Sequence, residues 1–334
     1  MKIYFLYFFL LTYGLIGCSQ KMNSSTENDE TGNDSIRFER FDKDLYNYLN
    51  APSSNSFDSI KAKYPEFLPA FGYITIKDSN ADSIVFNEKL IQYFSNDMLK
   101  QIYGEALNTF DNMSIYEAEL TKANDIIKER FESKKLPRIG THVSGFKENV
   151  VVLDDYLSIS IDKYLGKDNS FYLRFFEDFK RIQMQPQFMT RDILRAWIAS
   201  ELISAQQTNL RDNIINEGRI LYILSVLLPE REKNDLLGYT QQQADWCDSN
   251  EKNIWKVIIE NNYLFSNTPL LIAKFMNEAP YTAPISPESP GRIGAWTGYR
   301  IVESYMQHSN VPLDKLISIE AQTILKESKY NPQS

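Results

Sequence analysis

Apolar residues recur at helical spacing along most of this chain, and one short stretch alone has the pattern of strands. Residues 82–132 and the segments after residue 190 follow the 3.6-residue period of an amphipathic helix. Residues 137–162 instead carry β-type runs with turn residues between them, such as Val150 to Leu153. Helices, then a small sheet, then more helices predict an α+β fold, mostly helical and built as a single domain with a small β-sheet.

Capping and breaking signals bound the helices expected after the sheet. The third of these helices opens with Thr240-x-x-Gln243, a capping box, and the second stops before Pro229. The predicted helices cover residues 190–207, 210–228, 240–262, 293–307 and 319–328. Before them, Ala51 to Ser56 is expected to be a local loop.

The first 18 residues have the organisation of a bacterial lipoprotein export signal. Lys2 supplies a positive charge, residues 3–16 are almost wholly apolar, and Leu15-Ile16-Gly17-Cys18 resembles a lipobox. The apolar run is shorter than the roughly 20 residues that a membrane span needs. We therefore predict a signal peptide over residues 1–17 and fatty acids such as palmitate on Cys18. The lipid would anchor the protein to the inner or outer membrane.

Residues 18–35 are rich in Ser, Asn, Thr and acidic residues, and they predict an acidic flexible tether. Residues 36–334 contain no second linker and predict one globular domain, held in the cell envelope outside the cytoplasm. Once Cys18 carries lipid, Cys247 is the one remaining thiol, so no intrachain disulfide can form. Its place in a helical stretch predicts a buried, inert thiol.

Charge and ligand counts exclude two classes of function. The chain carries 36 Lys and Arg against 44 Asp and Glu, a net charge of −8. This balance argues against nucleic acid as a partner, because nucleic-acid binding needs a basic surface. Two His and two Cys in the whole chain disfavour zinc, which takes three or four His, Cys or acidic ligands together. We predict no metal and no cofactor.

One pentapeptide nevertheless has the frame of a zinc-peptidase motif. Ser200-Glu201-Leu202-Ile203-Ser204 matches H-E-x-x-H with Ser at both His positions. In the zinc enzymes the two His residues bind the metal and the Glu activates water. Neutral Ser is a poor zinc ligand, so the same chemistry cannot run here. The two Ser residues also fit a simple role as small packing residues on a helix face.

Glu217 follows 13 residues after Ser204, where a third, acidic ligand could stand. It shares an apolar stripe with Ile214 and Leu221, and a buried carboxylate must find a partner or protonate. We expect it to accept hydrogen bonds from the Ser hydroxyls, to pair with an Arg or Tyr, or to share a proton with Glu201. Arg292, at a helix start, is either such a partner or a surface residue. Ser200, Glu201, Ser204 and Glu217 thus form a predicted relic cleft with no catalytic residue, on a zincin-like fold.

Several blocks between about residues 146 and 330 resemble the gliding-motility lipoprotein family GldB. The blocks are Asp162-Lys163-Tyr164-Leu165-Gly166, Asn216-Glu217-Gly218-Arg219-Ile220-Leu221-Tyr222, Gly238-Tyr239-Thr240, Asp245-Trp246-Cys247, Asn250-Glu251-Lys252-Asn253-Ile254-Trp255 and the run from Ser289 to Val302. The resemblance implies a membrane-anchored accessory of the gliding machinery without established enzymatic activity. The family also looks like a distant relative of predicted zinc peptidases that carry H-E-x-x-H followed by E-G. This chain has Glu201, Glu217 and Gly218 but lacks both His.

Three functions remain open from the sequence. The first is a non-enzymatic lipoprotein that assists gliding-motility or secretion machinery, with the membrane and other envelope proteins as partners. The second is a hydrolase that uses Glu201 and Glu217 with another ligand set. The third is a carrier that binds a peptide or glycan in the relic cleft. Metal analysis separates the first from the second, and a ligand in the cleft would favour the third.

Overall fold

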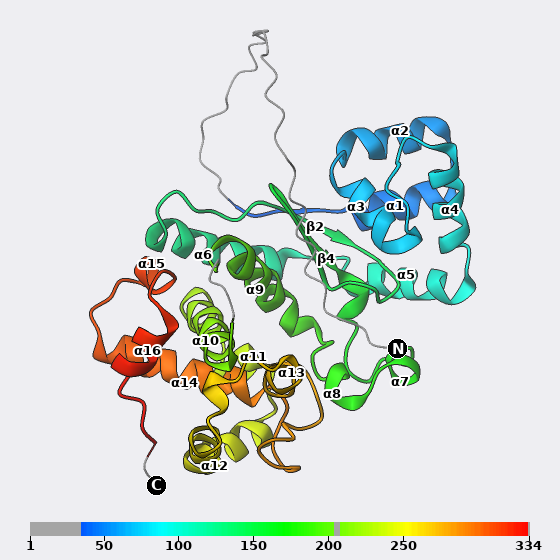
Figure 1. The fold of residues 1–334 in the computed structure, drawn as a ribbon. Coiled ribbons are helices and arrows are strands. Elements are labelled where there is room, and N and C mark those ends of the chain that lie inside the picture. Colours follow the sequence, from blue (N-terminus) through cyan, green and yellow to red (C-terminus); the bar gives the residue numbers. More distant parts are fainter. Residues whose placement is uncertain (1–34, 204–207, 333–334) are drawn as a thin grey trace. The chain divides into compact units, whose positions relative to one another are not determined.

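A small mixed sheet lies between two groups of helices in the computed structural model, which describes residues 35–203 and 208–332 (Figure 1). Its strand order is β1-β2-β4-β3, with β1 parallel to β2, β2 parallel to β4 and β3 antiparallel to β4. The strands are β1 (Phe38–Glu39), β2 (Arg138–His142), β3 (Val150–Leu153) and β4 (Tyr156–Ser160). The predicted β region is confirmed, and so is the mostly helical α+β fold.

Six helices separate β1 from β2. They are α1 (Phe41–Asn50), α2 (Ser54–Lys63), α3 (Phe67–Ile76), α4 (Ile84–Phe94), α5 (Asp97–Thr109) and α6 (Ser114–Arg130). The helices expected over residues 82–132 are present, whereas the first three were not predicted. The loop expected over residues 51–56 is wrong at its end, because Ser53 caps α2 by accepting a hydrogen bond from the Ser56 N–H at 3.2 Å.

Helices dominate again after β4. They are α7 (Tyr172–Phe175), α8 (Asp178–Arg181), α9 (Met189–Glu201), α10 (Leu210–Leu227), α11 (Lys233–Leu237), α12 (Gln241–Glu260), α13 (Pro269–Met276), α14 (Ile293–His308), α15 (Leu313–Leu316) and α16 (Ala321–Glu327). Short 3₁₀ turns cover Ile161–Lys163, Pro186–Phe188 and Tyr263–Phe265. The capping box at the start of α12 is confirmed, since Thr240 and Gln243 each accept a backbone hydrogen bond from the other.

The helix expected over residues 190–207 is shorter than predicted. Helix α9 ends at Glu201, where the N–H groups of Leu202 and Ile203 both donate to the carbonyl of Ile198, at 3.0 and 3.2 Å. Because these two N–H groups share one carbonyl, the last turn closes and the regular hydrogen-bond pattern of α9 ends there. Ser204, the last residue of the pentapeptide, lies outside the described residues.

Successive layers of packing connect the sheet to the C-terminal helices. Helix α9 packs against β3 and β4, α10 packs against α9, and α14 packs against α10. Two glycines allow the last approach, because a Cβ on Gly218 of α10 would overlap the backbone of Gly298 on α14, and a Cβ on Gly298 would overlap the carbonyl of Ile214 on α10. This close packing brings the N-terminus of α14 toward the face of α10 that carries Glu217.

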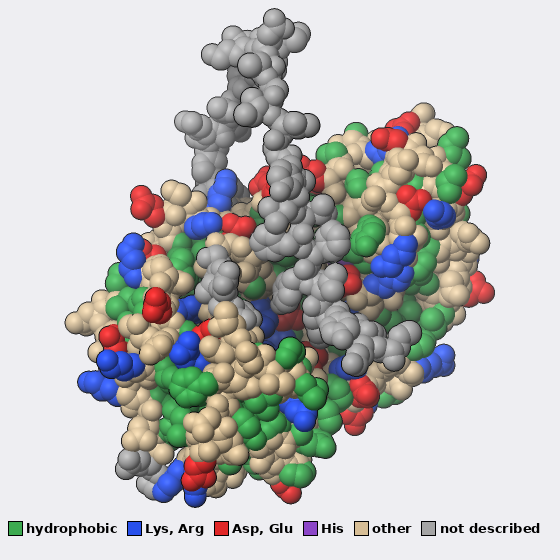
Figure 2. Space-filling view, in the orientation of Figure 1, with side chains coloured by type: hydrophobic (Ala, Val, Ile, Leu, Met, Phe, Trp, Pro, Cys, Tyr) green, Lys and Arg blue, Asp and Glu red, His purple; other side chains and the backbone are tan. Residues whose placement is uncertain are grey.

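The described surface mixes both signs of charge. Basic and acidic side chains are interspersed on the face drawn in Figure 2, with hydrophobic side chains between them. Within residues 35–203 and 208–332, none of the helices combines the length and apolar character that crossing a membrane requires.

Candidate functional site

Glu217 lies at the centre of a buried ion cluster. Its residue is 8% exposed, on the inward stripe of α10 that the sequence predicts. Arg195 on α9 forms a two-point pair with it, including a contact of 2.8 Å from Nη2 to Oε2. Arg292, the residue that precedes α14, donates from Nη2 to Oε1 at 2.9 Å. Of the partners considered for Glu217, the structure thus supplies arginine, and it supplies two.

The charges in this cluster hold Glu217 ionised. Burial alone would raise the pKa of Glu217, but attraction and hydrogen bonds from Arg195, followed by those from Arg292, lower it to about 2. Both guanidinium groups contact carboxylate oxygens of Glu217. The two guanidinium groups therefore lie beside the carboxylate oxygens, at the positions that a metal ion bound by Glu217 would have to take.

Arg292 reaches this position through an unusual backbone. Its φ is +59°, in the left-handed region that non-glycine residues seldom adopt. The preceding Gly291 passes so close to the carbonyl of Ala279 that a Cβ would overlap it. From there the guanidinium also donates to the carbonyl of Leu237 at 3.2 Å, which ties the start of α14 to the end of α11.

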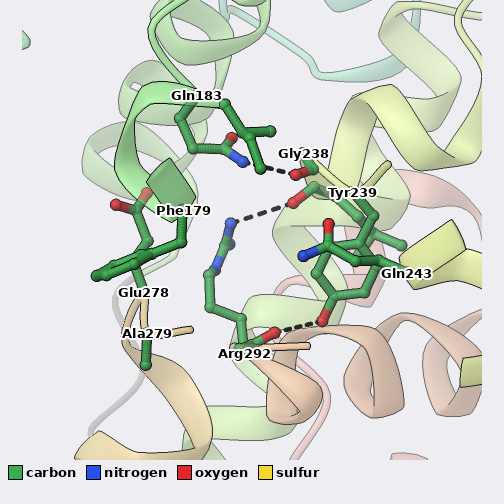
Figure 3. A pocket seen from close by; sticks show the side chains of 11 residues that line it. Phe179, Gln183, Gly238, Tyr239, Gln243, Glu278, Ala279 and Arg292 are labelled. Carbon is green, nitrogen blue, oxygen red and sulfur yellow. Dashed lines mark hydrogen bonds between the residues drawn. The ribbon is translucent and has the colours of Figure 1, made fainter. Parts of the chain in front are cut away.

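Arg292 also lines a small hollow, together with residues such as Gln183, Tyr239 and Glu278 (Figure 3). Gln183 donates to the carbonyl of Gly238 at 2.6 Å on one wall, and the Tyr239 hydroxyl donates to the carbonyl of Gly291 at 2.6 Å on another. Its volume is about 30 Å³, far below the several hundred cubic ångströms of pockets that enclose drug-sized ligands.

Other parts of the predicted relic cleft have their own partners. The Ser200 hydroxyl donates to the carbonyl of Trp197 at 3.1 Å, so it is used within its own helix. The side chain of Glu201 is 40% exposed and pairs with Lys134 at 3.0 Å. Within the described part of the chain, neither residue is hydrogen-bonded to Glu217, and Ser204 is not described. The cleft formed by all four residues stays a prediction.

Sequence reasoning missed Arg195 and left Arg292 as one of two options. Arg195 stands five residues before Ser200, and its signal was a basic residue on a helix expected to neighbour the Glu217 helix. That signal does not give the crossing geometry of α9 and α10. In contrast, the Pro290-Gly291 pair before Arg292 does predict a turn that could aim a side chain inward.

A second buried polar cluster surrounds Asp162, the first residue of one of the family blocks. Its carboxylate accepts hydrogen bonds from the N–H of Phe146 at 2.8 Å, the N–H of Ser144 at 3.3 Å and the Ser160 hydroxyl at 2.5 Å. It thereby fastens the loop between β2 and β3. Two residues further on, the Tyr164 hydroxyl donates to Asp192 of α9 at 2.8 Å.

The two His residues have different surroundings. His142 ends β2, with its Nδ1 2.8 Å from the Ser158 hydroxyl, and burial lowers its pKa to about 3. His308 is the last residue of α14, with Nδ1 2.8 Å from the carbonyl of Ser304. Over residues 35–203 and 208–332, no group of three His, Cys, Asp or Glu residues is placed to hold a metal ion.

Comparison with known proteins gives one match. The sequence model of a family described as gliding motility protein GldB matches residues 23–332, and it confirms the resemblance seen in the sequence. No curated protein and no solved structure matches the chain, so the zincin-like relationship remains without support.

Proposed function

Because the chain belongs to the gliding motility family GldB, we propose that it acts as a membrane-anchored, non-enzymatic accessory of gliding-motility or secretion machinery. The observation that supports this proposal most directly is the double pairing of Glu217 with Arg195 and Arg292. In an active relative, the corresponding carboxylate would face a metal cation. In this chain two guanidinium groups compensate the charge of Glu217, and the resulting ion pairs join α9, α10 and the start of α14.

The proposed anchor is lipid on Cys18. Gliding-motility membership and the absence of a spanning helix among the described residues both fit an envelope protein held by lipid. Cys18 itself lies outside the described residues, so its role rests on the lipobox. Two or more acyl chains give stable anchoring, whereas a single one is marginal.

Genetic complementation tests the accessory role. A gliding bacterium that lacks its own copy of this gene would receive the wild-type chain, a Glu201→Gln variant or a Cys18→Ser variant. We expect Glu201→Gln to restore motility, since Glu201 is a half-exposed residue paired only with Lys134. Cys18→Ser should fail, because the domain would lose its place in the envelope. Loss of motility with Glu201→Gln at normal protein level would instead support a hydrolase.

Metal analysis of the purified full-length protein provides an independent test. We expect less than one zinc ion per chain after dialysis, because the positive charges of Arg195 and Arg292 repel a zinc ion beside Glu217. One tightly held zinc per chain that is lost in Glu217→Gln would contradict the proposal.

A further inference from the structure

The two edges of the sheet differ in how their backbone groups are bonded. On the β1 side, the N–H of Ile36 donates to the Thr121 hydroxyl at 2.9 Å, and the N–H of Phe38 donates to the Glu117 carboxylate at 3.0 Å. Side chains of α6 therefore close this edge, which is also only two residues long. Strand β3 forms the opposite edge.

Strand β3 directs backbone groups away from the sheet. The N–H of Ser160 donates to the carbonyl of Asn149 at 2.8 Å, so these two residues form a hydrogen-bonded pair across the β3–β4 hairpin. Such pairs alternate along an antiparallel ladder, and the register therefore turns the N–H and C=O groups of Val150 and Val152 outward. Over residues 35–203 and 208–332, none of these four groups has a hydrogen-bond partner. Both residues are partly exposed, so the edge is open to a second strand.

The composition of β3 does not protect this edge. Edge strands are commonly guarded by charged residues, Pro or a bulge, and the sequence from Val150 to Leu153 is Val-Val-Val-Leu. Helix α9 packs against β3 and β4 and so holds the strand in place. A regular, apolar strand with free N–H and C=O groups is a template for pairing with another extended segment.

One end of this edge is acidic. Asp154 and Asp155 follow β3 directly and are exposed. Arg138 lies 4.0 Å from Asp155 but is shared with Glu39, at 3.3 Å. Among the described residues, no cation lies within 4.0 Å of Asp154. A segment that pairs with β3 therefore gains from a basic residue at this end.

We propose that an extended segment of a partner protein adds to β3 as a further strand of the sheet. Its main chain would exchange hydrogen bonds with the N–H and C=O groups of Val150 and Val152. Apolar residues would alternate along its middle, and basic residues would stand beside Asp154 and Asp155. The proposal deepens the accessory role and rests on it for the origin of the partner, a protein of the envelope machinery.

A second copy of this chain fits the edge less well than a basic segment. Symmetric antiparallel pairing that uses all the free groups sets Val150 of one copy opposite Val152 of the other. The same register sets Glu148 opposite Asp154 of the other copy, and it does so on both sides of the symmetry axis. Strand β3 is about 13 Å long, and an edge of that length supplies only a small part of the roughly 1,200 Å² that a stable interface buries.

Peptide binding to the full-length lipoprotein in detergent, followed by fluorescence anisotropy, tests the proposal directly. The first probe is a labelled octapeptide with two Lys at its N-terminus and alternating Thr and Val after them, so that antiparallel pairing brings the Lys residues to Asp154 and Asp155. The second probe has the same sequence with N-methyl groups on two adjacent central residues, which block both of its edges. We expect the unmodified probe to bind about tenfold more tightly, because methylation removes main-chain hydrogen bonds. Equal affinities for these two probes would overturn the proposal without any variant.

A proline variant locates the binding edge. Val152→Pro removes one outward N–H and leaves the bonds to β4, which come from Val151 and Leu153, in place. It should weaken the unmodified probe about tenfold. The matched control is Val152→Ala, which shortens the same side chain but keeps the N–H, and it should stay within about threefold of wild type. Far-UV circular dichroism and thermal unfolding check that both variants fold.

A third probe, with Glu in place of the two Lys residues, tests the acidic end. It should bind about threefold more weakly than the Lys probe, and the difference should shrink in high salt. Asp154→Asn with Asp155→Asn should remove the preference for Lys. The matched control is Asp82→Asn with Asp97→Asn, at side chains that are 91% and 92% exposed, and it should keep the preference. A preference for Lys that persists without Asp154 and Asp155 would assign the charge recognition to other residues and contradict this part of the proposal.

Other outcomes count against strand addition as a whole. An equal loss of affinity in Val152→Pro and Val152→Ala would assign binding to the side chain. A dimer of the full-length protein that disappears in Val152→Pro, without binding of any probe, would assign the edge to a second copy. The affinities are measured apart from motility, so a failure of the accessory role in cells would leave this result standing, and the reverse also holds.

Discussion

Replacing Glu217 should destabilise the fold through two uncompensated arginines. In the folded protein the carboxylate has a pKa of about 2, against an ordinary 4.5, and its side chain is 10% exposed. A pKa difference of one corresponds to about 1.4 kcal/mol, so the pairing contributes roughly 3 kcal/mol at neutral pH. Glu217→Gln keeps the shape and removes the charge, and we expect it to lower the free energy of unfolding by about this amount. Glu217→Ala should cost about 3–5 kcal/mol, as when a buried ion pair loses one partner.

The pH dependence carries a specific sign. Because the pKa of Glu217 is lower in the folded than in the unfolded state, its contribution is complete above pH 4.5 and disappears as the pH falls toward 2. The difference in stability between wild type and Glu217→Gln should therefore shrink steadily over this window. Subtracting the two curves cancels the titration of the other carboxylates.

Urea unfolding followed by far-UV circular dichroism measures these differences, provided that the slope m stays constant. Glu230→Gln is the matched control, because the Glu230 side chain is 85% exposed and its ion-pair partner, Lys122, is 72% exposed. Such a surface pair contributes little, and we expect a change below about 0.5 kcal/mol. A loss under 1 kcal/mol in Glu217→Gln, or a difference that does not vary between pH 5 and 2, would refute the charge argument.

Three further outcomes follow from particular residues. Fatty-acid labelling should be lost in Cys18→Ser, and labelling equal to wild type would contradict the lipobox. Gly218→Ala should destabilise by about 1–3 kcal/mol in thermal unfolding, because the added Cβ overlaps the Gly298 carbonyl. Gly104→Ala in α5, with open space around it, should instead be neutral or stabilise by up to about 1 kcal/mol. Cys247 is fully buried, and burial raises the pKa of its thiol, so it should react with a thiol reagent only as fast as the protein opens.

The sequence could predict those elements whose local signals agree with their packing. The capping box at Thr240 marks the start of α12, and it is visible in the sequence because Thr240 and Gln243, which form it, are only three residues apart. Strands β2, β3 and β4 were found from the β-type runs, since residues such as Val150 to Leu153 are unlike the helices around them, whereas β1 was not predicted. The inward position of Glu217 followed from the helical period alone.

Where the sequence failed, tertiary contacts or misleading composition were responsible. The polar run before Phe57 suggested a loop, yet Ser53 and Ser56 cap α2 while Phe57 and Ile60 are buried in the core. The pentapeptide from Ser200 suggested a longer helix, but α9 closes at Glu201. Helical periodicity predicts which face of a helix points inward, but it does not predict the residue at which the helix ends.

The arginine partners were hardest to predict because they depend on how helices cross. Arg195 precedes Glu217 by 22 residues and Arg292 follows it by 75, so no short-range pattern connects the three. What connects them is the approach of α10 to α14, which the facing glycines Gly218 and Gly298 permit. Gly218 directly follows Glu217, so the residue that needs the arginine and the residue that lets its helix approach are neighbours in the chain.

This adjacency gives the family blocks a physical reading that does not require catalysis. A glycine after the carboxylate serves close packing of α10 on α14, and the Gly291-Arg292 turn delivers the compensating charge at the start of α14. A carboxylate that only bound a metal would need neither the second helix nor its arginine. The Glu217-Gly218 pair is therefore accounted for by the joining of α9, α10 and α14, in which the carboxylate holds the two arginines and the glycine allows the helices to approach.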